Sequence, residues 1–259
     1  MDGRENFPCL RELNIWVCPK LVEMPIFPSI TSLNIGESNA MLIKSLMNLT
    51  SLSSIQIGGM HESTLLPDGL FQNLTAMKRF TLVYCEGLES LPEGLQYLHS
   101  LRELEILRCT NILSFPVNGL RGLSSLQMLR IHHCDKFCSL SEGIQYLTSL
   151  EYLLIYGCPK LVSLPEQIGC LTSLSTLGIW SCHKLMSLPD ELQNLTALKR
   201  LSIGNCPHLQ RRCKNDSGED WHKIARIPNI HIDDPPPMRP PVQSRNGCKA
   251  LQKLKFWST

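Results

Sequence analysis

The 259-residue sequence lacks any apolar run close to the roughly 18 residues that a membrane-spanning helix requires. Its first residues carry charges at Asp2, Arg4 and Glu5 and lack the apolar segment of a secretory signal peptide. Aromatic residues are scarce at 6%, and the net charge is only +2. Twelve cysteines are too few for a small disulfide scaffold. We therefore predict a folded protein without a membrane span or a signal peptide.

Catalytic and phosphate-binding motifs are also missing. The sequence contains no phosphate loop of the form G-x-x-x-x-G-K-[ST], no G-x-G-x-x-G, no H-E-x-x-H and no G-x-S-x-G. No Ser/His/Asp or Cys/His set stands outside the repeats described next. We therefore predict that the chain is not an enzyme and uses no cofactor.

What the sequence does contain is an internal repeat of the form L-x-x-L-x-I-x-x-C. Nine copies end at intervals of 20, 22, 25, 24, 25, 24, 24 and 24 residues, which is near-constant spacing. The copies are LRELNIWVC (10–18), ITSLNIGES (30–38), LSSIQIGGM (52–60), MKRFTLVYC (77–85), LRELEILRC (101–109), LQMLRIHHC (126–134), LEYLLIYGC (150–158), LSTLGIWSC (174–182) and LKRLSIGNC (198–206).

Two further patterns separate these copies: L-x-S-L-P, as in 161–165 and 185–189, and L-T-S-L with its variants. Alternation of apolar and polar residues in the template predicts a short strand with one buried face. One unit cannot bury that face alone, but stacked units place their strands side by side over a continuous core. The proline after Ser-Leu stops the ladder and turns the chain toward the outer side.

This pattern resembles the leucine-rich repeat over residues 10–206. The resemblance implies an α/β repeat solenoid, a leucine-rich-repeat horseshoe with a concave parallel β-sheet and an irregular or short-helical convex side. We expect a repeat array over 1–206 of about nine units, irregular over 10–75 and regular over 76–206.

Seven of the twelve cysteines occupy the last template position, which leucine-rich repeats fill with Asn or Cys. A buried free cysteine acts there as a small apolar side chain with a weak S–H donor. Side chains of neighbouring parallel turns point the same way, which is a poor geometry for disulfides. We predict a structural cysteine ladder of free thiols at Cys18, Cys85, Cys109, Cys134, Cys158, Cys182 and Cys206.

The segment HHCDKFC (132–138) offers two histidines and two cysteines, which invites a zinc interpretation. In the repeat register, however, His132 and His133 project from the strand end while Cys134 turns inward. The four groups would not converge on a tetrahedral site. We therefore predict no metal site.

Four N-x-[ST] triplets fit the glycosylation acceptor pattern. Three of them lie in the outer pattern, where other copies lack the asparagine. The cysteine ladder favours a reducing compartment, so we predict a cytoplasmic protein, with nuclear and membrane-peripheral locations as alternatives. The four asparagines are Asn48, Asn73, Asn194 and Asn215.

The passage CPHLQRRCKNDSGEDWHKIARIPNIHID (206–233) narrows the family. It resembles the closing segment of plant intracellular coiled-coil nucleotide-binding leucine-rich-repeat (NBS-LRR) disease resistance proteins. Physically it predicts a cap, because a solenoid must cover its last apolar face. Ser217 with Asp220 would form a capping box for a short helix carrying Trp221 and Ile224, and NIHID would add a final strand.

Residues 207–234 are thus the predicted cap, and 235–259 are a proline-rich linker and basic tail that we expect to be disordered. Within the tail, LQKLKFW (251–257) echoes the strand template, which leaves an extra strand open. No comparable cap precedes the first repeat, so the chain is expected to begin inside the array.

The resemblance implies a role in plant innate immunity. In that family the repeats sense pathogen effectors, or host proteins that effectors alter, and restrain an upstream nucleotide-binding switch. The implied partners are an effector or guarded host protein, and the receptor's own nucleotide-binding domain in a full-length protein. Two other classes stay open: a stand-alone scaffold or decoy in a signalling complex, and a secreted recognition module.

The repeat register also names the exposed strand positions. The concave face mixes both charge signs, which disfavours a nucleic-acid groove. Aromatic and arginine side chains dominate interface energies, although some aromatics would only cover neighbouring backbone. The predicted partner-binding residues are Trp16, Tyr84, Glu103, Glu105, Arg108, Arg130, His132, His133, Tyr152, Tyr156, Trp180 and Arg200.

Overall fold

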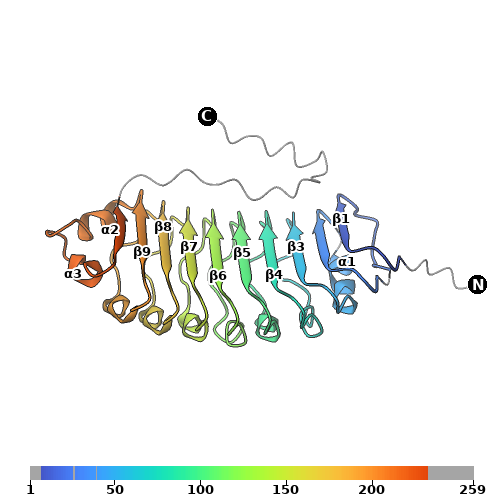
Figure 1. Cartoon of the computed structure of the whole chain (residues 1–259). Coiled ribbons are helices and arrows are strands. Elements are labelled where there is room, and N and C mark those ends of the chain that lie inside the picture. The colour runs from blue at the N-terminus through green and yellow to red at the C-terminus, as the bar shows by residue number, and fades with distance from the viewer. Residues whose placement is uncertain (1–6, 26, 39, 233–259) are drawn as a thin grey trace, which may run out of the picture.

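The computed structural model describes residues 7–25, 27–38 and 40–232, and these form a solenoid around one parallel sheet (Figure 1). Ten strands follow one another in sequence order. They are β1 (Glu12–Trp16), β2 (Ser32–Gly36), β3 (Ser54–Gly58), β4 (Arg79–Val83), β5 (Glu103–Leu107), β6 (Met128–His132), β7 (Tyr152–Tyr156), β8 (Thr176–Trp180), β9 (Arg200–Gly204) and β10 (Asn229–Ile232).

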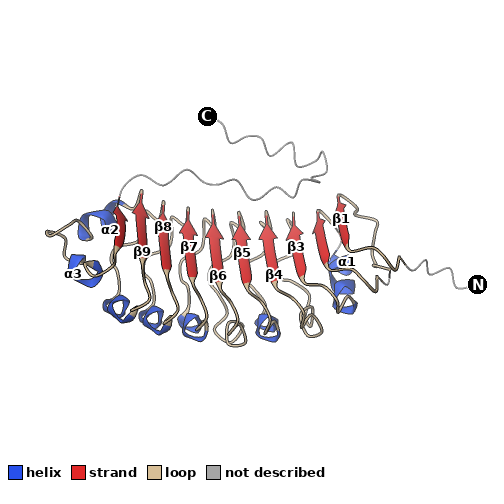
Figure 2. Cartoon of the chain, viewed as in Figure 1, coloured by secondary structure: helices blue, strands red, loops and turns tan. Residues whose placement is uncertain are grey.

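Short helices follow one another along the other side of the solenoid (Figure 2). They are α1 (Ala40–Ser45) and the 3₁₀ helices η1 (Leu46–Asn48), η2 (Glu93–Tyr97), η3 (Glu142–Tyr146), η4 (Glu166–Cys170) and η5 (Asp190–Asn194). Pro92, Pro165 and Pro189 stand directly before η2, η4 and η5 in an extended conformation. Each proline carbonyl accepts a hydrogen bond from the N–H three residues on, so the proline is where the outer helix begins.

The core lies between the sheet and these helices. The second and fourth residues of each strand point into it and are almost fully buried from β2 to β9, as with Leu129 and Ile131 in β6. Strands pair residue for residue, so that Leu104, Leu129 and Leu153 follow one another across β5, β6 and β7. This is the predicted α/β repeat solenoid, because each unit buries its apolar face against its neighbours.

Each strand from β1 to β9 is followed by one residue with a positive φ. Seven of these nine residues are not glycine, although the left-handed region disfavours other side chains. After β1 to β8, the N–H of this residue extends the ladder by donating to the last carbonyl of the next strand, as from Tyr84 to Leu107 at 2.9 Å and from Arg108 to His132 at 2.7 Å. The left-handed residue therefore ends each strand and turns the chain inward.

The ladder cysteines come directly after that turn. Six of the seven are fully buried, and each of the seven thiols donates to the carbonyl two residues earlier at 3.3–3.8 Å. Cys18 is half-buried, because β1 has a strand neighbour on only one side among the described residues. All cysteines in the described part of the chain are free thiols.

The C-terminal end is covered by α2 (Pro207–Arg212), α3 (Trp221–Ile224) and β10, which pairs with β9 in parallel as the sequence predicts. The predicted capping box is wrong. Asp220 is itself the residue before α3, and its carboxylate makes no capping hydrogen bond to the backbone of that helix. Ion pairs hold the carboxylate instead, to Arg212 at 3.0 Å and to Lys223 at 3.0 Å.

The ion pair between Asp220 and Lys223 joins the cap to the last repeat. Asp220 accepts the Leu188 N–H at 3.0 Å, and Lys223 donates to the Leu188 carbonyl at 2.6 Å. Lys223 also pairs with Asp190 at 2.7 Å. The cap thus supplies the backbone of Leu188 with hydrogen-bond partners where the array ends. The last residues of the predicted cap (233–234), the linker and basic tail (235–259) and the possible strand at 251–257 lie outside the described residues.

Candidate protein-interaction site

The concave face is built from three rows of side chains, one each from the first, third and fifth residues of the strands. The row of fifth residues runs through Val83, Leu107, His132, Tyr156 and Trp180 in consecutive strands. Apolar and aromatic groups therefore lie next to one another from β4 to β8. The left-handed residues Tyr84, Arg108 and His133 continue this face one position further on.

An aromatic cluster lies on β6–β8, and we define it as His132, His133, Tyr156 and Trp180. The rings of His132 and Tyr156 are stacked, with centroids 6.1 Å apart, and His133 meets Tyr156 edge-on at 4.9 Å. A Cβ on Gly157 would lie 2.7 Å from Nδ1 of His133, so the imidazole lies over the bare backbone of that glycine. The geometry fixes three rings against one another.

Trp180 is held in a similar way. Its indole folds back along β8 over Gly178, where a Cβ would lie 2.3 Å from two ring atoms and 2.9 Å from a methyl of Leu154. The missing side chain of Gly178 therefore makes room for the indole beside Leu154. Both glycines act by leaving space above the sheet.

Trp16 does not join this cluster. Its indole crosses to the next two strands and covers Gly36 and Gly58, where added Cβ atoms would lie 2.3 and 2.8 Å from the ring. It thus covers neighbouring backbone at the N-terminal end of the sheet.

Three of the predicted charged residues form ion pairs between neighbouring strands, and one of these pairs involves Arg79, which is not among the predicted residues. Arg79 donates to Glu103 at 2.9 Å, and Arg130 pairs with Glu105. Arg108 lies over the ring of Tyr84, 5.5 Å from its centroid. Arg200 and Tyr152 are exposed at the first positions of β9 and β7. The structure thus brings the predicted residues of β4–β9 onto one face.

Burial lowers the pKa of His132 to about 4, with smaller contributions from Arg130 and His133, so this imidazole is neutral near pH 7. Its Nε2 and the Trp180 Nε1 are buried and have no hydrogen-bond partner among the described residues. Because both nitrogen atoms are buried, a bound partner could form a hydrogen bond with either of them only after neighbouring side chains moved.

Sequence reasoning missed four apolar members of the face: Val83, Leu107, Met128 and Leu154. The repeat register could have identified Leu154, because it stands at the same strand position as Arg130 and Gly178, which face the concave side. The prediction selected aromatic and charged types, whereas YLLIY also places Leu154 on the concave face, between the two predicted tyrosines of β7. The centre of the surface is therefore more apolar than predicted.

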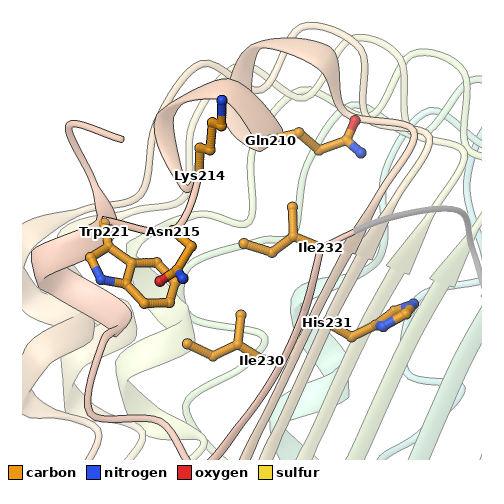
Figure 3. A pocket seen from close by; sticks show the side chains of 7 residues that line it. All are labelled: Gln210, Lys214, Asn215, Trp221, Ile230, His231 and Ile232. Carbon is orange, nitrogen blue, oxygen red and sulfur yellow. The ribbon is translucent and has the colours of Figure 1, made fainter. Parts of the chain in front are cut away.

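A hollow of about 550 Å³ lies within the C-terminal cap, between residues 210–221 and β10. Figure 3 shows Trp221 and Asn215 on one side of it and Ile230 and Ile232 on the other. Because its apolar lining joins α3 to the last strand, we attribute it to packing of the cap. Elsewhere in the described ranges, no group of three or more His, Cys, Asp or Glu side chains is placed to hold a metal ion.

The strands, the concave face and the cysteine turns together define a leucine-rich repeat protein. A family model described as a leucine-rich repeat region matches residues 94–259, which is more than half of the chain, and the chain belongs to this family. None of the helices in the described part of the chain has the length and apolarity to cross a membrane.

Two relatives are plant proteins from Solanum bulbocastanum. The putative disease resistance protein RGA1 is 32% identical over 95 residues, and the putative disease resistance protein RGA4 is 36% identical over 78 residues. The matches cover 37% and 30% of this chain but only 10% and 8% of those proteins. The predicted resemblance to the leucine-rich repeat region of plant disease resistance proteins is confirmed.

Solved structures share the fold. The leucine-rich repeat domain of the type III effector XCV3220 (XopL) superposes with a TM-score of 0.57 at 22% identity, covering 86% of this chain and 76% of that domain. The Toll–Spatzle complex from Drosophila gives a TM-score of 0.60 at 21% identity, covering 75% of this chain and 26% of the matched chain. At these identities the likeness concerns the fold alone.

Proposed function

We propose that this chain binds a partner protein through the concave face of its sheet, with the aromatic cluster of β6–β8 at the centre of the contact. One observation carries this proposal: the cluster is fixed before any partner arrives. His133 lies over Gly157, Trp180 lies over Gly178, and Tyr156 contacts both histidines. Rings that are already held in place lose little conformational entropy on binding, which favours recognition.

The biological setting that we propose is plant defence. Its support is the relationship to disease resistance proteins of Solanum bulbocastanum. In this proposal the repeats sense a pathogen effector, or a host protein that an effector alters, and restrain a nucleotide-binding switch. The sequence itself carries no phosphate loop, so that switch is supplied by a domain other than these repeats.

Within this proposal the protein works in the cytoplasm. Free, buried thiols support a reducing compartment. A secreted recognition module is the alternative, and all four acceptor asparagines are exposed. Mass spectrometry of the protein purified from plant tissue distinguishes the two, because we expect unmodified asparagines and a secreted protein would carry glycans. The positions to examine are Asn48, Asn73, Asn194 and Asn215.

A pairwise two-hybrid screen of pathogen effectors and host proteins against the chain tests the proposed site. A partner of the unchanged chain should be lost with Tyr156→Ala. Tyr97→Ala is the matched control, because Tyr97 is an exposed aromatic residue on η2, on the other side of the solenoid. Circular dichroism should show that both variants keep the fold. A partner that binds all three proteins equally would sink the assignment of the site.

A further inference from the structure

Charge is unevenly distributed along the concave face. We count the first, third and fifth residue of each strand and the left-handed residue after it. On β1–β3 these positions carry two glutamates and no basic residue, a net charge of −2. On β4–β9 they carry four arginines and two glutamates, a net charge of +2. The aromatic cluster lies in the positive part.

The edge where the strands begin strengthens this asymmetry. The residues directly before β4, β5 and β9 are Lys78, Arg102 and Lys199, and the acidic residue at this position from β4 to β9 is Glu151. Lys78, Arg102 and Lys199 are all exposed. Because Arg79 and Arg130 are already paired with glutamates, these edge cations account for much of the positive potential that a partner would meet.

Two of these cations line a hollow of about 420 Å³ at the same edge. Lys78 and Arg102 line it together with Gln127, Ser100, Ser125 and Ser149. The three serines come from equivalent turns of successive repeats, in HSL, SSL and TSL. Two cations with hydroxyl and amide donors around them form a surface suited to carboxylates.

The hollow and the aromatic cluster belong to one continuous surface. The backbone carbonyl of Gln127 accepts the backbone N–H of Tyr152 at 2.9 Å, and Tyr152, the first residue of β7, is 37% exposed. Along the same strand, Leu154 and Tyr156 lead to the cluster. A chain segment lying across β5–β8 would therefore meet cations and hydroxyls first and aromatic rings next.

From this arrangement we infer that the partner presents a linear acidic segment that carries at least one large apolar side chain. Its carboxylates lie against Lys78 and Arg102, and its apolar side chain packs on Tyr152, Tyr156 and Trp180. This inference rests on the proposed function and adds the chemistry of the partner. Complementary charge sets the orientation of the segment, and the aromatic rings supply most of the affinity.

Selection from a random dodecapeptide display library on the immobilised full chain tests this inference. We expect enriched peptides to be net negative and to contain Trp, Phe, Tyr or Leu. A synthetic copy of the leading peptide should bind about tenfold or more weakly to the Lys78→Glu/Arg102→Glu variant and to Tyr156→Ala. Lys44→Glu/Lys214→Glu is the control for charge, since both lysines are exposed outside this face, and its affinity should stay near that of the unchanged chain.

The outcomes separate the two claims. Selected peptides that lose binding with Tyr156→Ala but are neutral or basic would contradict the inference that the partner segment is acidic. They would still support a binding site on the concave face. Peptides that bind Tyr156→Ala and Trp180→Ala as well as the unchanged chain would contradict both. If no selected peptide binds the concave face, the claim that the partner presents a linear segment is wrong. The two-hybrid screen still tests whether the concave face is the binding site.

Discussion

The indole of Trp180 occupies the space that Gly178, two residues earlier on β8, leaves above the sheet. A Cβ on Gly178 would lie 2.3 Å from two atoms of that ring, a distance at which one group must move. Gly178 has no positive φ, so the reason for glycine here is the ring and not the backbone conformation. A small residue on the sheet thus determines where the largest side chain of the site lies.

Gly178→Ala should therefore displace the indole and weaken partner binding. We expect a loss of about 1–3 kcal/mol in the free energy of unfolding, because an overpacked contact strains its neighbours. Ser202→Ala, at the paired position on β9, is the control and should change the free energy of unfolding by less than about 0.5 kcal/mol. Urea unfolding of the two variants measures this difference. Equal free energies of unfolding for the two variants would contradict this prediction, because they would show that Trp180 can move aside without strain.

Asp220 should be essential to the cap. Its carboxylate is fully buried and holds two cations and the Leu188 N–H. Asp220→Asn leaves Arg212 and Lys223 without that charge, so we expect a loss of about 3–5 kcal/mol. Asp216→Asn, an exposed change in the same loop, should cost less than about 0.5 kcal/mol. Urea midpoints that agree for the two variants would contradict the assigned role of the buried pair.

The same carboxylate predicts acid sensitivity. Burial raises the pKa of Asp220, but Arg212, the Leu188 N–H and Lys223 outweigh it and hold the pKa below its ordinary value. A carboxyl with a depressed pKa stabilises the fold above its ordinary pKa of about 4 and loses that contribution as the pH falls further. The stability difference between the unchanged chain and Asp220→Asn should therefore shrink below about pH 4.

His132 predicts a second pH dependence, in a different range. Its pKa is about 4 in the fold, against an ordinary value of 6.5, because burial disfavours the cation. Between these values the unfolded chain binds a proton that the folded chain does not, so stability falls as the pH drops from 6.5 toward 4. His132→Phe keeps a ring beside Tyr156 and cannot be protonated. Between about pH 7 and about pH 5, the free energy of unfolding should fall less for this variant than for the unchanged chain. An equal fall in both proteins would exclude His132 as its source.

The buried cysteines of the ladder should react with alkylating reagents far more slowly than the exposed cysteines outside it. Burial raises the pKa of Cys134 to about 12, and hydrogen bonding with Cys158 together with burial raises that of Cys182 to about 12. Since the thiolate is the nucleophile, both should resist alkylation until the chain unfolds. Cys138 and Cys170 are exposed and should react in the native state. Iodoacetamide labelling read peptide by peptide checks this pattern, and rapid native labelling of Cys182 would contradict it.

The sequence predicts the strands well because each repeat carries the same alternation and the spacing is nearly constant. The template could not predict the left-handed residue after each strand, since Val17, Tyr84 and Arg108 have no side chain typical of a positive φ. That conformation follows from the inward turn and the extra ladder hydrogen bond. It is a property of neighbouring repeats and not of one residue type.

The site was only partly predictable for a related reason. Trp16 and Trp180 stand at the same template position, yet one covers two glycines of the following strands and the other lies over Gly178 of its own strand. The surroundings of Trp16 depend on residues 20 or more positions away, and those of Trp180 on a glycine two positions earlier on the same face of its strand. Likewise, the capping box failed because Arg212 and the distant Leu188 claim the carboxylate of Asp220.

The central claim is that the concave face binds the partner, and two matched tyrosines test it most directly. Tyr152 on β7 and Tyr97 on η2 are 37% and 40% exposed, so their removal should affect folding to a similar, small degree. Titration calorimetry of a partner found in the screen should give a dissociation constant raised about tenfold or more by Tyr152→Ala and unchanged by Tyr97→Ala. Weakening by Tyr97→Ala alone would place the partner on the convex side and contradict the account.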